Sequence, residues 1–135
     1  MMRGKTLDQL IAEAQANIGH ISAEALKTAI ENKEPIVLLD VRDPELYESE
    51  HLPGAISLPR AGIELEINEL VPNQDAQIVT YCGGKTRGTL SAHTLRLMGY
   101  EKASVLTGGF RGWKAAGLPT EGEKSAEPEN QKREK

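Results

Sequence analysis

The sequence lacks a second cysteine and a surplus of basic residues. One cysteine among 135 residues permits no disulfide within the chain and supplies too few ligands for a structural zinc site, so we expect a reducing compartment and no bound metal. The formal net charge of -4 argues against binding to nucleic acid, because the phosphates of nucleic acid attract basic surfaces.

Long apolar segments are also missing. The first residues lack the apolar run of a signal peptide, and no later segment approaches the roughly 20 apolar residues that span a membrane. We therefore expect a cytoplasmic protein that does not interact with membranes.

The length and composition predict one domain with a short extension at each end. Residues 6–17 have the three-and-four spacing of an amphipathic helix, with a face that consists of Leu7, Leu10, Ile11, Ala14 and Ile18. Residues 121–135 contain no apolar residue larger than alanine and cannot offset the entropy of ordering. We therefore predict a helical extension over 1–18, a folded domain over 19–120 and a disordered charged tail over 121–135.

Short apolar runs alternate with helical segments along the folded domain. Strands are predicted at 36–41, 77–81 and 103–106, and their uninterrupted apolarity is typical of parallel strands covered on both faces. A helix capped by Ser22 and ending at Ile30 precedes them, and further helices are predicted at 44–49, 60–70, 86–98 and 110–116. This alternation predicts an α/β fold with a parallel sheet.

The single cysteine, Cys82, directly follows the second predicted strand. Ligand sites collect at the carboxyl ends of parallel strands, where loops lead into helices. Gly83 and Gly84 allow the backbone N–H groups to point inward as an anion-binding nest at the start of a helix. With the nearby cations Lys85 and Arg87, such a nest favours a thiolate, which predicts a nucleophile at this position.

The residues of this loop allow two other interpretations. A lone cysteine is commonly a small buried hydrophobe, but packing alone does not require two glycines and two cations in succession. The run Gly-Gly-Lys-Thr also resembles part of a phosphate-binding loop. That motif requires a glycine five positions before Gly84, where this chain has Val79.

Three separated motifs resemble those of the rhodanese-like sulfurtransferases. They are LLDVRDPELYESEHLPGAISLP at 38–59, CGGKTR at 82–87 and LTGGFRGWKAAGLPTE at 106–121. The resemblance covers about residues 18–121 and implies a three-layer α/β/α fold around a parallel five-stranded sheet, with no cofactor or metal. The loop departs from many members of the family in having Gly83 at its second position and Lys85 at its fourth.

The resemblance implies transfer of a sulfane sulfur through a persulfide on Cys82. The donor would be a small molecule such as thiosulfate, and the acceptor cyanide, a thiol or a protein cysteine. Asp40 and Arg42 would support the site from the end of the first apolar strand. The loop residues that would bind the anionic sulfur are Gly83, Gly84, Lys85, Thr86 and Arg87.

Two rival functions remain open. One is a sulfur-relay module whose partner is another protein, with the N-terminal helix as its interface. The other is a phosphatase or arsenate reductase, which the resemblance disfavours because the related phosphatases have a seven-residue loop, whereas Cys82 to Arg87 spans six residues. His51 is expected to brace a turn, and Trp113 to pack in the core.

Overall fold

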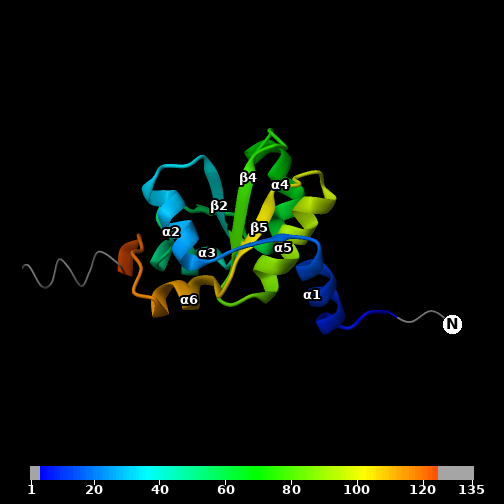
Figure 1. Ribbon diagram of the computed structural model, residues 1–135, viewed down its shortest axis with the longest axis horizontal. Helices are drawn as coiled ribbons and strands as arrows, with labels where there is room; N and C mark the ends of the chain where they lie inside the picture. The colour runs from blue at the N-terminus through cyan, green and yellow to red at the C-terminus, as the bar shows by residue number, and fades with distance from the viewer. Residues whose placement is uncertain (1–3, 125–135) are drawn as a thin grey trace, which may run out of the picture.

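The computed structural model describes residues 4–124 of the chain. Its centre is a five-stranded sheet in the order β1-β5-β4-β2-β3, and every pair of neighbouring strands is parallel (Figure 1). The strands are β1 (Gly19–Ile21), β2 (Ile36–Asp40), β3 (Ile56–Ser57), β4 (Gln77–Tyr81) and β5 (Ala103–Leu106). The predicted α/β fold with a parallel sheet is confirmed.

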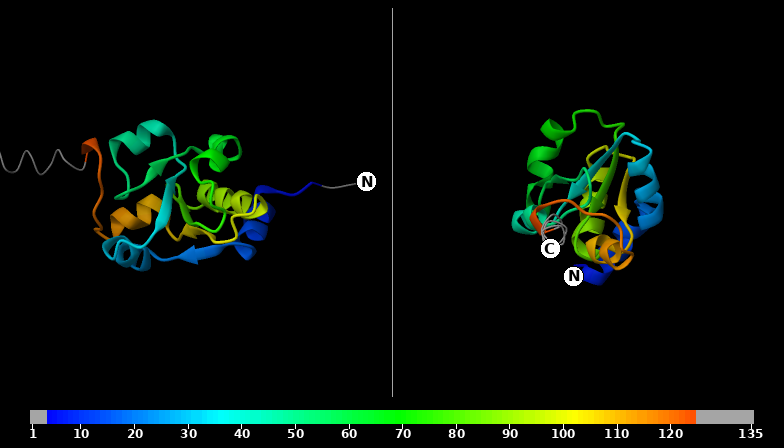
Figure 2. Two further views of the ribbon diagram at one scale, coloured as in Figure 1. Left: turned by 90° about the horizontal axis from the view of Figure 1, so that it is seen from above. Right: turned by 90° about the vertical axis from the view of Figure 1, so that its left-hand side faces the viewer.

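Helices cover both faces of this sheet (Figure 2). They are α1 (Leu7–Ala16), α2 (Ala23–Glu31), α3 (Pro44–Ser49), the 3-10 turn η1 (Arg60–Gly62), α4 (Ile63–Leu70), α5 (Thr86–Leu97) and α6 (Gly109–Ala115). Side chains of α2 and α6 pack on one face of the sheet, and those of α4 and α5 pack on the other. The structure thus has three layers.

Successive side chains of a strand pack alternately into these two cores. On β2, Leu38 belongs to the core under α2 and α6, whereas Leu39 belongs to the core under α4 and α5. Because successive residues of a strand point to opposite faces, a strand buried on both sides has to be apolar at every position. This explains the uninterrupted apolar runs of the sequence.

The helix ends follow their local signals. The Ser22 side chain accepts a hydrogen bond from the Ala25 N–H at 3.1 Å and caps α2. After α5, Gly99 adopts a left-handed φ of 102°, and the Tyr100 N–H donates to the Leu95 carbonyl at 2.9 Å, which is a common way to end a helix. The segment predicted as one helix over 60–70 is divided into η1 and α4.

The N-terminal helix α1 packs against α5. Ile11 and Ala14 are buried in this contact, whereas Leu7 and Leu10 remain 54% and 42% exposed. The apolar face predicted for this helix is therefore covered only in part, because α1 packs mainly against α5. No helix among residues 4–124 is long and apolar enough to cross a membrane.

The segment after α6 returns to the folded domain. Glu121, the first residue of the predicted tail, exchanges two main-chain hydrogen bonds of 2.8 Å with His51. Residues 125–135, which make up most of that predicted tail, lie outside the described residues.

Candidate active site

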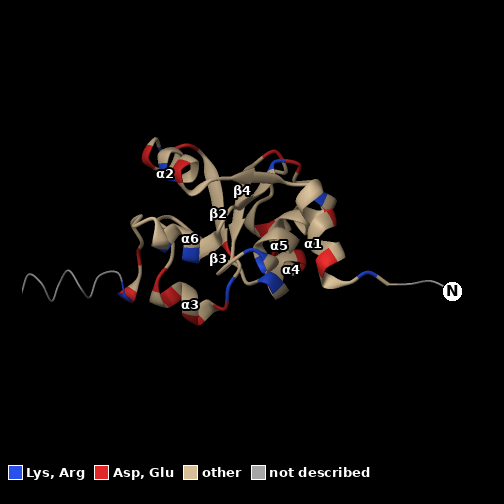
Figure 3. Ribbon diagram, turned by 60° about the horizontal axis from the view of Figure 1, so that its bottom comes forward, with Lys and Arg blue, Asp and Glu red and all other residues tan. Residues whose placement is uncertain are grey.

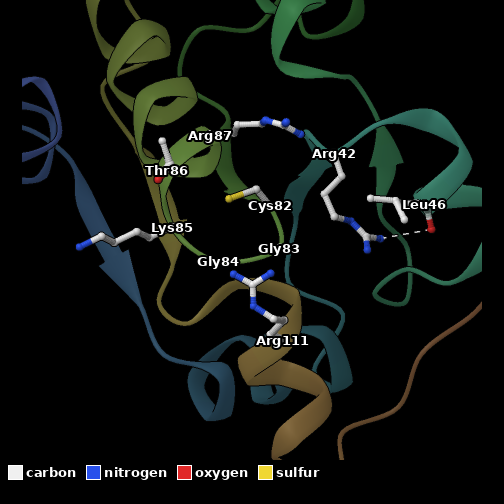
Figure 4. A pocket seen from close by; sticks show the side chains of 9 residues that line it. All are labelled: Arg42, Leu46, Cys82, Gly83, Gly84, Lys85, Thr86, Arg87 and Arg111. Atoms are coloured by element: carbon white, nitrogen blue, oxygen red, sulfur yellow. Dashed lines mark hydrogen bonds between the residues drawn. The ribbon is translucent and has the colours of Figure 1, made fainter. Parts of the chain in front are cut away.

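The cysteine loop lies at the carboxyl edge of the sheet, between the end of β4 and the start of α5. β4 is flanked by β5 and β2, so the loop emerges from the middle of the sheet. A pocket of about 320 Å³ opens there (Figure 4). Its lining consists of Arg42, Leu46, Cys82, Gly83, Gly84, Lys85, Thr86, Arg87 and Arg111, and so includes four cations and no carboxylate.

The start of α6 holds the loop through its carbonyl groups. The Phe110 N–H donates to the Cys82 carbonyl at 2.8 Å, and the Arg111 N–H donates to the Gly83 carbonyl at 3.0 Å. In a trans peptide the C=O and the following N–H point in opposite directions, so the N–H groups of Gly83 and Gly84 point away from α6. Among residues 4–124, neither of these N–H groups has an acceptor, which leaves both available for an anion.

Glycine is required where α6 approaches the loop. Gly109 has a left-handed φ of 61°, and a Cβ atom there would lie 2.7 Å from the Cys82 carbonyl oxygen. Gly88 plays a similar part on α5, since a Cβ atom at this position would lie 3.3 Å from the Cys82 N atom. Two helices therefore close tightly around the backbone of the cysteine.

The Cys82 sulfur points into the space that the loop encloses (Figure 4). The residue is only 5% exposed, and its inner side contacts the core under α4 and α5. The alternative that Cys82 is merely a core hydrophobe predicts a sulfur that faces away from the loop, which is not the geometry seen. Because Cys82 lines the pocket, a small substrate can approach the thiol from there.

The other predicted loop residues differ in their orientation. Lys85 precedes the first turn of α5, and its side chain extends away from Cys82, whereas the Arg87 side chain extends toward the chain at Arg42 (Figure 4). The Arg87 guanidinium lies 3.9 Å from the Asp43 carboxylate, and both side chains are largely exposed. Thr86 is the first residue of α5. These loop residues all line the pocket, as the sequence predicted. The sequence did not predict in which direction each charged side chain points.

Asp40 and Arg42 form a buried ion pair beside the loop. Arg42 donates to both carboxylate oxygens of Asp40, at distances of 2.7 to 3.2 Å, and Asp40 is fully buried. Arg42 also donates to the Glu50 carbonyl at 2.6 Å, and its guanidinium lies 4.1 Å from the Phe110 ring centroid. Arg42 joins the sheet to α3 and α6 and lines the pocket; the supporting role predicted for Asp40 and Arg42 stays a prediction.

Tyr81 completes the same buried network. Its hydroxyl donates to Asp40 at 2.8 Å and accepts from the Leu52 N–H at 3.1 Å. Burial, reinforced by the Asp40 charge, raises the pKa of Tyr81, so the phenol keeps its proton and remains a donor. Burial alone would lower the pKa of Arg42, but the hydrogen bonds and charge of Asp40 outweigh it and raise that pKa.

His51 lies outside the pocket lining. Its Nδ1 atom lies 2.6 Å from the Tyr47 carbonyl oxygen, and its ring stacks on that of Tyr47 with centroids 3.9 Å apart. These contacts, with the main-chain pairing to Glu121, fit the expected bracing role. Trp113 is buried as predicted, and its Nε1 atom donates to the Pro119 carbonyl at 2.7 Å.

Two residues of the pocket, Leu46 and Arg111, were not predicted from the sequence. Of these two, Arg111 carries a charge. It belongs to α6 and is brought to Cys82 by the contact between α6 and the loop. The available signal was its position within the motif GGFRGW, two residues after the glycine that contacts the loop.

Comparison with known proteins places the chain in a family. Residues 22–116 match the rhodanese-like domain family. Thiosulfate sulfurtransferase GlpE of Pseudoalteromonas translucida is 37% identical over 85 residues, which are 63% of this chain and 79% of that protein. YrkF of Bacillus subtilis, a candidate sulfur carrier protein by its name, is 33% identical over 76% of this chain, and the match spans 54% of that protein's length.

Solved structures share the fold. A Rhodopseudomonas palustris protein of unknown function, described as a possible tyrosine phosphatase, has a TM-score of 0.81 and 26% identity over 90% of this chain and 98% of its own. The thiosulfate sulfurtransferase of Pseudomonas aeruginosa has a TM-score of 0.76 and 27% identity, and the match covers 86% of this chain and 22% of that one. With its parallel sheet, its cysteine loop and these relatives, the chain belongs to the rhodanese-like family.

Proposed function

We propose that the protein is a sulfurtransferase that carries sulfur as a persulfide on Cys82. The observation that supports this most directly is the loop itself. Its carbonyl groups are bound by α6, its glycine N–H groups are left without acceptors among residues 4–124, and the cysteine sulfur points into the space between them. Such a ring stabilises a sulfur anion by the same physics as an oxyanion hole.

The first step loads the cysteine. The Cys82 thiolate attacks the outer sulfur of a donor such as thiosulfate, so a new S–S bond forms as the S–S bond of thiosulfate breaks. Sulfite leaves with the electron pair of that bond. The product, Cys82–S–S⁻, carries one negative charge, which the N–H groups of Gly83 and Gly84 and the start of α5 stabilise.

The second step transfers the sulfur from Cys82 to an acceptor. A nucleophilic acceptor, such as cyanide, a small thiol or a protein cysteine, attacks the terminal sulfur and forms a bond to it. The bond between the two sulfur atoms then breaks, and its electron pair returns to Cys82 as the thiolate. The cycle is a covalent exchange of the ping-pong type, in which each half-reaction uses the same pocket.

Intact mass spectrometry tests the first step. After incubation with thiosulfate, the native protein should gain about 32 Da, the mass of one sulfur atom, together with release of one sulfite, as covalent catalysis requires. Cys82→Ser should show no gain and should unfold at the same denaturant concentration as the native chain. Absence of the gain in the native protein, with thiosulfate and with a persulfide donor, would refute the proposal.

A sulfur-relay role is a variant of this proposal, and the relationship to YrkF favours it. In that case the physiological donor or acceptor is a protein, and turnover of thiosulfate is incidental. The exposed Leu7 and Leu10 of α1 offer apolar surface outside the family match. Slow release of sulfite, combined with fast transfer from the Cys82 persulfide to the cysteine of a carrier protein, would distinguish a relay from a thiosulfate enzyme.

Phosphatase activity is a second candidate, because one structural neighbour is described as a possible tyrosine phosphatase. The same ring of N–H groups could bind a phosphate. Hydrolysis of p-nitrophenyl phosphate that is lost in Cys82→Ser would support this function. Persulfide formation without such hydrolysis would exclude it.

A further inference from the structure

Arg111, like Lys85, is a cation of the pocket that has no carboxylate partner among residues 4–124. Its side chain is exposed, lines the pocket with Cys82, and forms no ion pair within the part of the chain that the structure describes. Figure 4 shows the guanidinium below Gly83 and Gly84, directed toward the loop. Its positive charge therefore remains available to a ligand.

The other three cations of the pocket are less available. Arg42 is neutralised by the buried Asp40 carboxylate, and Arg87 lies near Asp43. Lys85 extends away from the sulfur (Figure 4). Figure 3 shows the wider pattern, in which α3 carries acidic residues and α6 carries basic ones. The uncompensated charge beside the sulfur thus comes from α6.

The loop sequence makes room for this guanidinium. A Cβ atom at position 83 would lie 2.9 Å from Arg111 Nη1, and one at position 84 would lie 2.5 Å from Arg111 Nη2. A side chain at either position would displace the arginine. The Gly83-Gly84 pair therefore has two roles. Its N–H groups are available to the sulfur, and its lack of side chains lets the Arg111 guanidinium lie against the loop.

The Arg111 side chain is not needed to hold the loop in place. That contact is made by its main-chain N–H, which donates to the Gly83 carbonyl and is retained whatever the side chain. The guanidinium is a planar fork of N–H donors that suits an oxyanion with two or more oxygen atoms. Its position beside the loop matches the departing end of a sulfur donor, because the transferred sulfur occupies the loop itself.

We propose that Arg111 is a specificity-determining residue that binds the oxyanion end of the sulfur donor and so selects donors with a doubly charged, three-oxygen leaving group. This inference rests on the proposed sulfurtransferase function. The residue acts on the part of thiosulfate that leaves as sulfite, whereas the glycine N–H groups act on the part that stays as the persulfide.

Two donors of matched shape test the proposal. Thiosulfate leaves as sulfite, whereas methanethiosulfonate, with a methyl group in place of one charged oxygen, leaves as methanesulfinate. In both reactions one S–S bond breaks as the Cys82 persulfide forms. Arg111→Gln should lower kcat/KM for loading from thiosulfate about tenfold, equivalent to about 1.4 kcal/mol, but no more than about threefold for methanethiosulfonate. The loss should fall mainly on KM, because the residue binds the donor.

Control variants distinguish donor binding by Arg111 from a general effect of removing a positive charge. Lys102→Gln removes the same charge from an exposed residue just before β5, at the opposite edge of the sheet, and should leave the ratio of the two donors unchanged. Arg111→Lys should recover part of the thiosulfate preference. Equal losses with both donors, or a native ratio in Arg111→Gln, would overturn the role of Arg111 while the sulfurtransferase function stands. Failure of the native protein to load from either donor would overturn both.

Discussion

Replacement of Gly109 by alanine tests whether α6 holds the cysteine loop in its anion-binding form. Gly109 has a φ of 61°, and an added Cβ atom would lie 2.7 Å from the Cys82 carbonyl oxygen. The loop and the helix would have to separate. The two main-chain hydrogen bonds from Phe110 and Arg111 to the loop would then lengthen or break.

The expected loss of stability has two parts. A left-handed φ costs alanine about 1–2 kcal/mol relative to glycine. The two hydrogen bonds contribute about 0.5–1.5 kcal/mol each. Gly109→Ala should therefore destabilise the protein by about 2–5 kcal/mol, the sum of the strain and the lost bonds. It should also slow persulfide formation, because the N–H groups of the loop no longer converge on the sulfur.

Gly117 provides the matched control for Gly109→Ala. Its φ is 74°, but an added Cβ atom would meet nothing within 4 Å. Gly117→Ala should therefore show the backbone strain alone, about 1–2 kcal/mol, with native loading of sulfur. Urea denaturation followed by the fluorescence of the single tryptophan, Trp113, which is buried on α6, measures the stability. Equal stabilities and equal loading rates for the two variants would refute the reasoning.

Two further variants test the groups around the pocket. Asp40→Asn leaves the buried Arg42 charge without a counterion and should cost about 3–5 kcal/mol in urea denaturation; a loss below about 1 kcal/mol, the usual value of an exposed pair, would contradict this. Glu50 accepts from Lys114 and Thr120; burial alone would raise its pKa, but these hydrogen bonds outweigh it and lower the pKa. Glu50→Gln should therefore be less stable than the native chain at pH 7 by about 1 kcal/mol.

The pH dependence of the Glu50 contribution follows from the sign of its shift. A carboxyl whose pKa is lower in the folded than in the unfolded state stabilises the protein above the unfolded value, about 4.3 for glutamate. That stabilisation is lost as the pH falls through the lower folded pKa. The difference between native and Glu50→Gln proteins should therefore be constant from pH 7 to about 5 and should close below about pH 4. A difference that widens in acid would contradict this assignment.

The strands at the two edges of the sheet show where local patterns fail. β1 and β3 have three and two residues, too few for any periodicity to be seen in the sequence. They become strands because β1 pairs with β5 and β3 pairs with β2. In the sequence, only the resemblance to a family implies five strands.

The candidate site also has one part that local sequence patterns predict and one part that they do not. Cys82, its glycines and the start of α5 are contiguous in sequence, so the strand, the turn and the helix that follow one another there predict an anion-binding loop with a thiol at its start. Arg111 lies far along the chain, and its place beside Cys82 depends on α6 approaching the loop at Gly109. The motif GGFRGW marks the segment around Arg111, but the motif by itself does not indicate which loop that segment contacts.

The sequence by itself determined the central strands, the helix ends and the position of Cys82 between a strand and a helix, because each depends on apolar periodicity, capping residues and turn residues within a few positions of one another. The tertiary structure decided which charges face the sulfur. Lys85 extends away, Arg42 is paired with Asp40, and Arg111 lies against the glycines. Charge orientation is set by packing between segments distant in sequence, and such contacts exist only once the sheet and its helices have assembled.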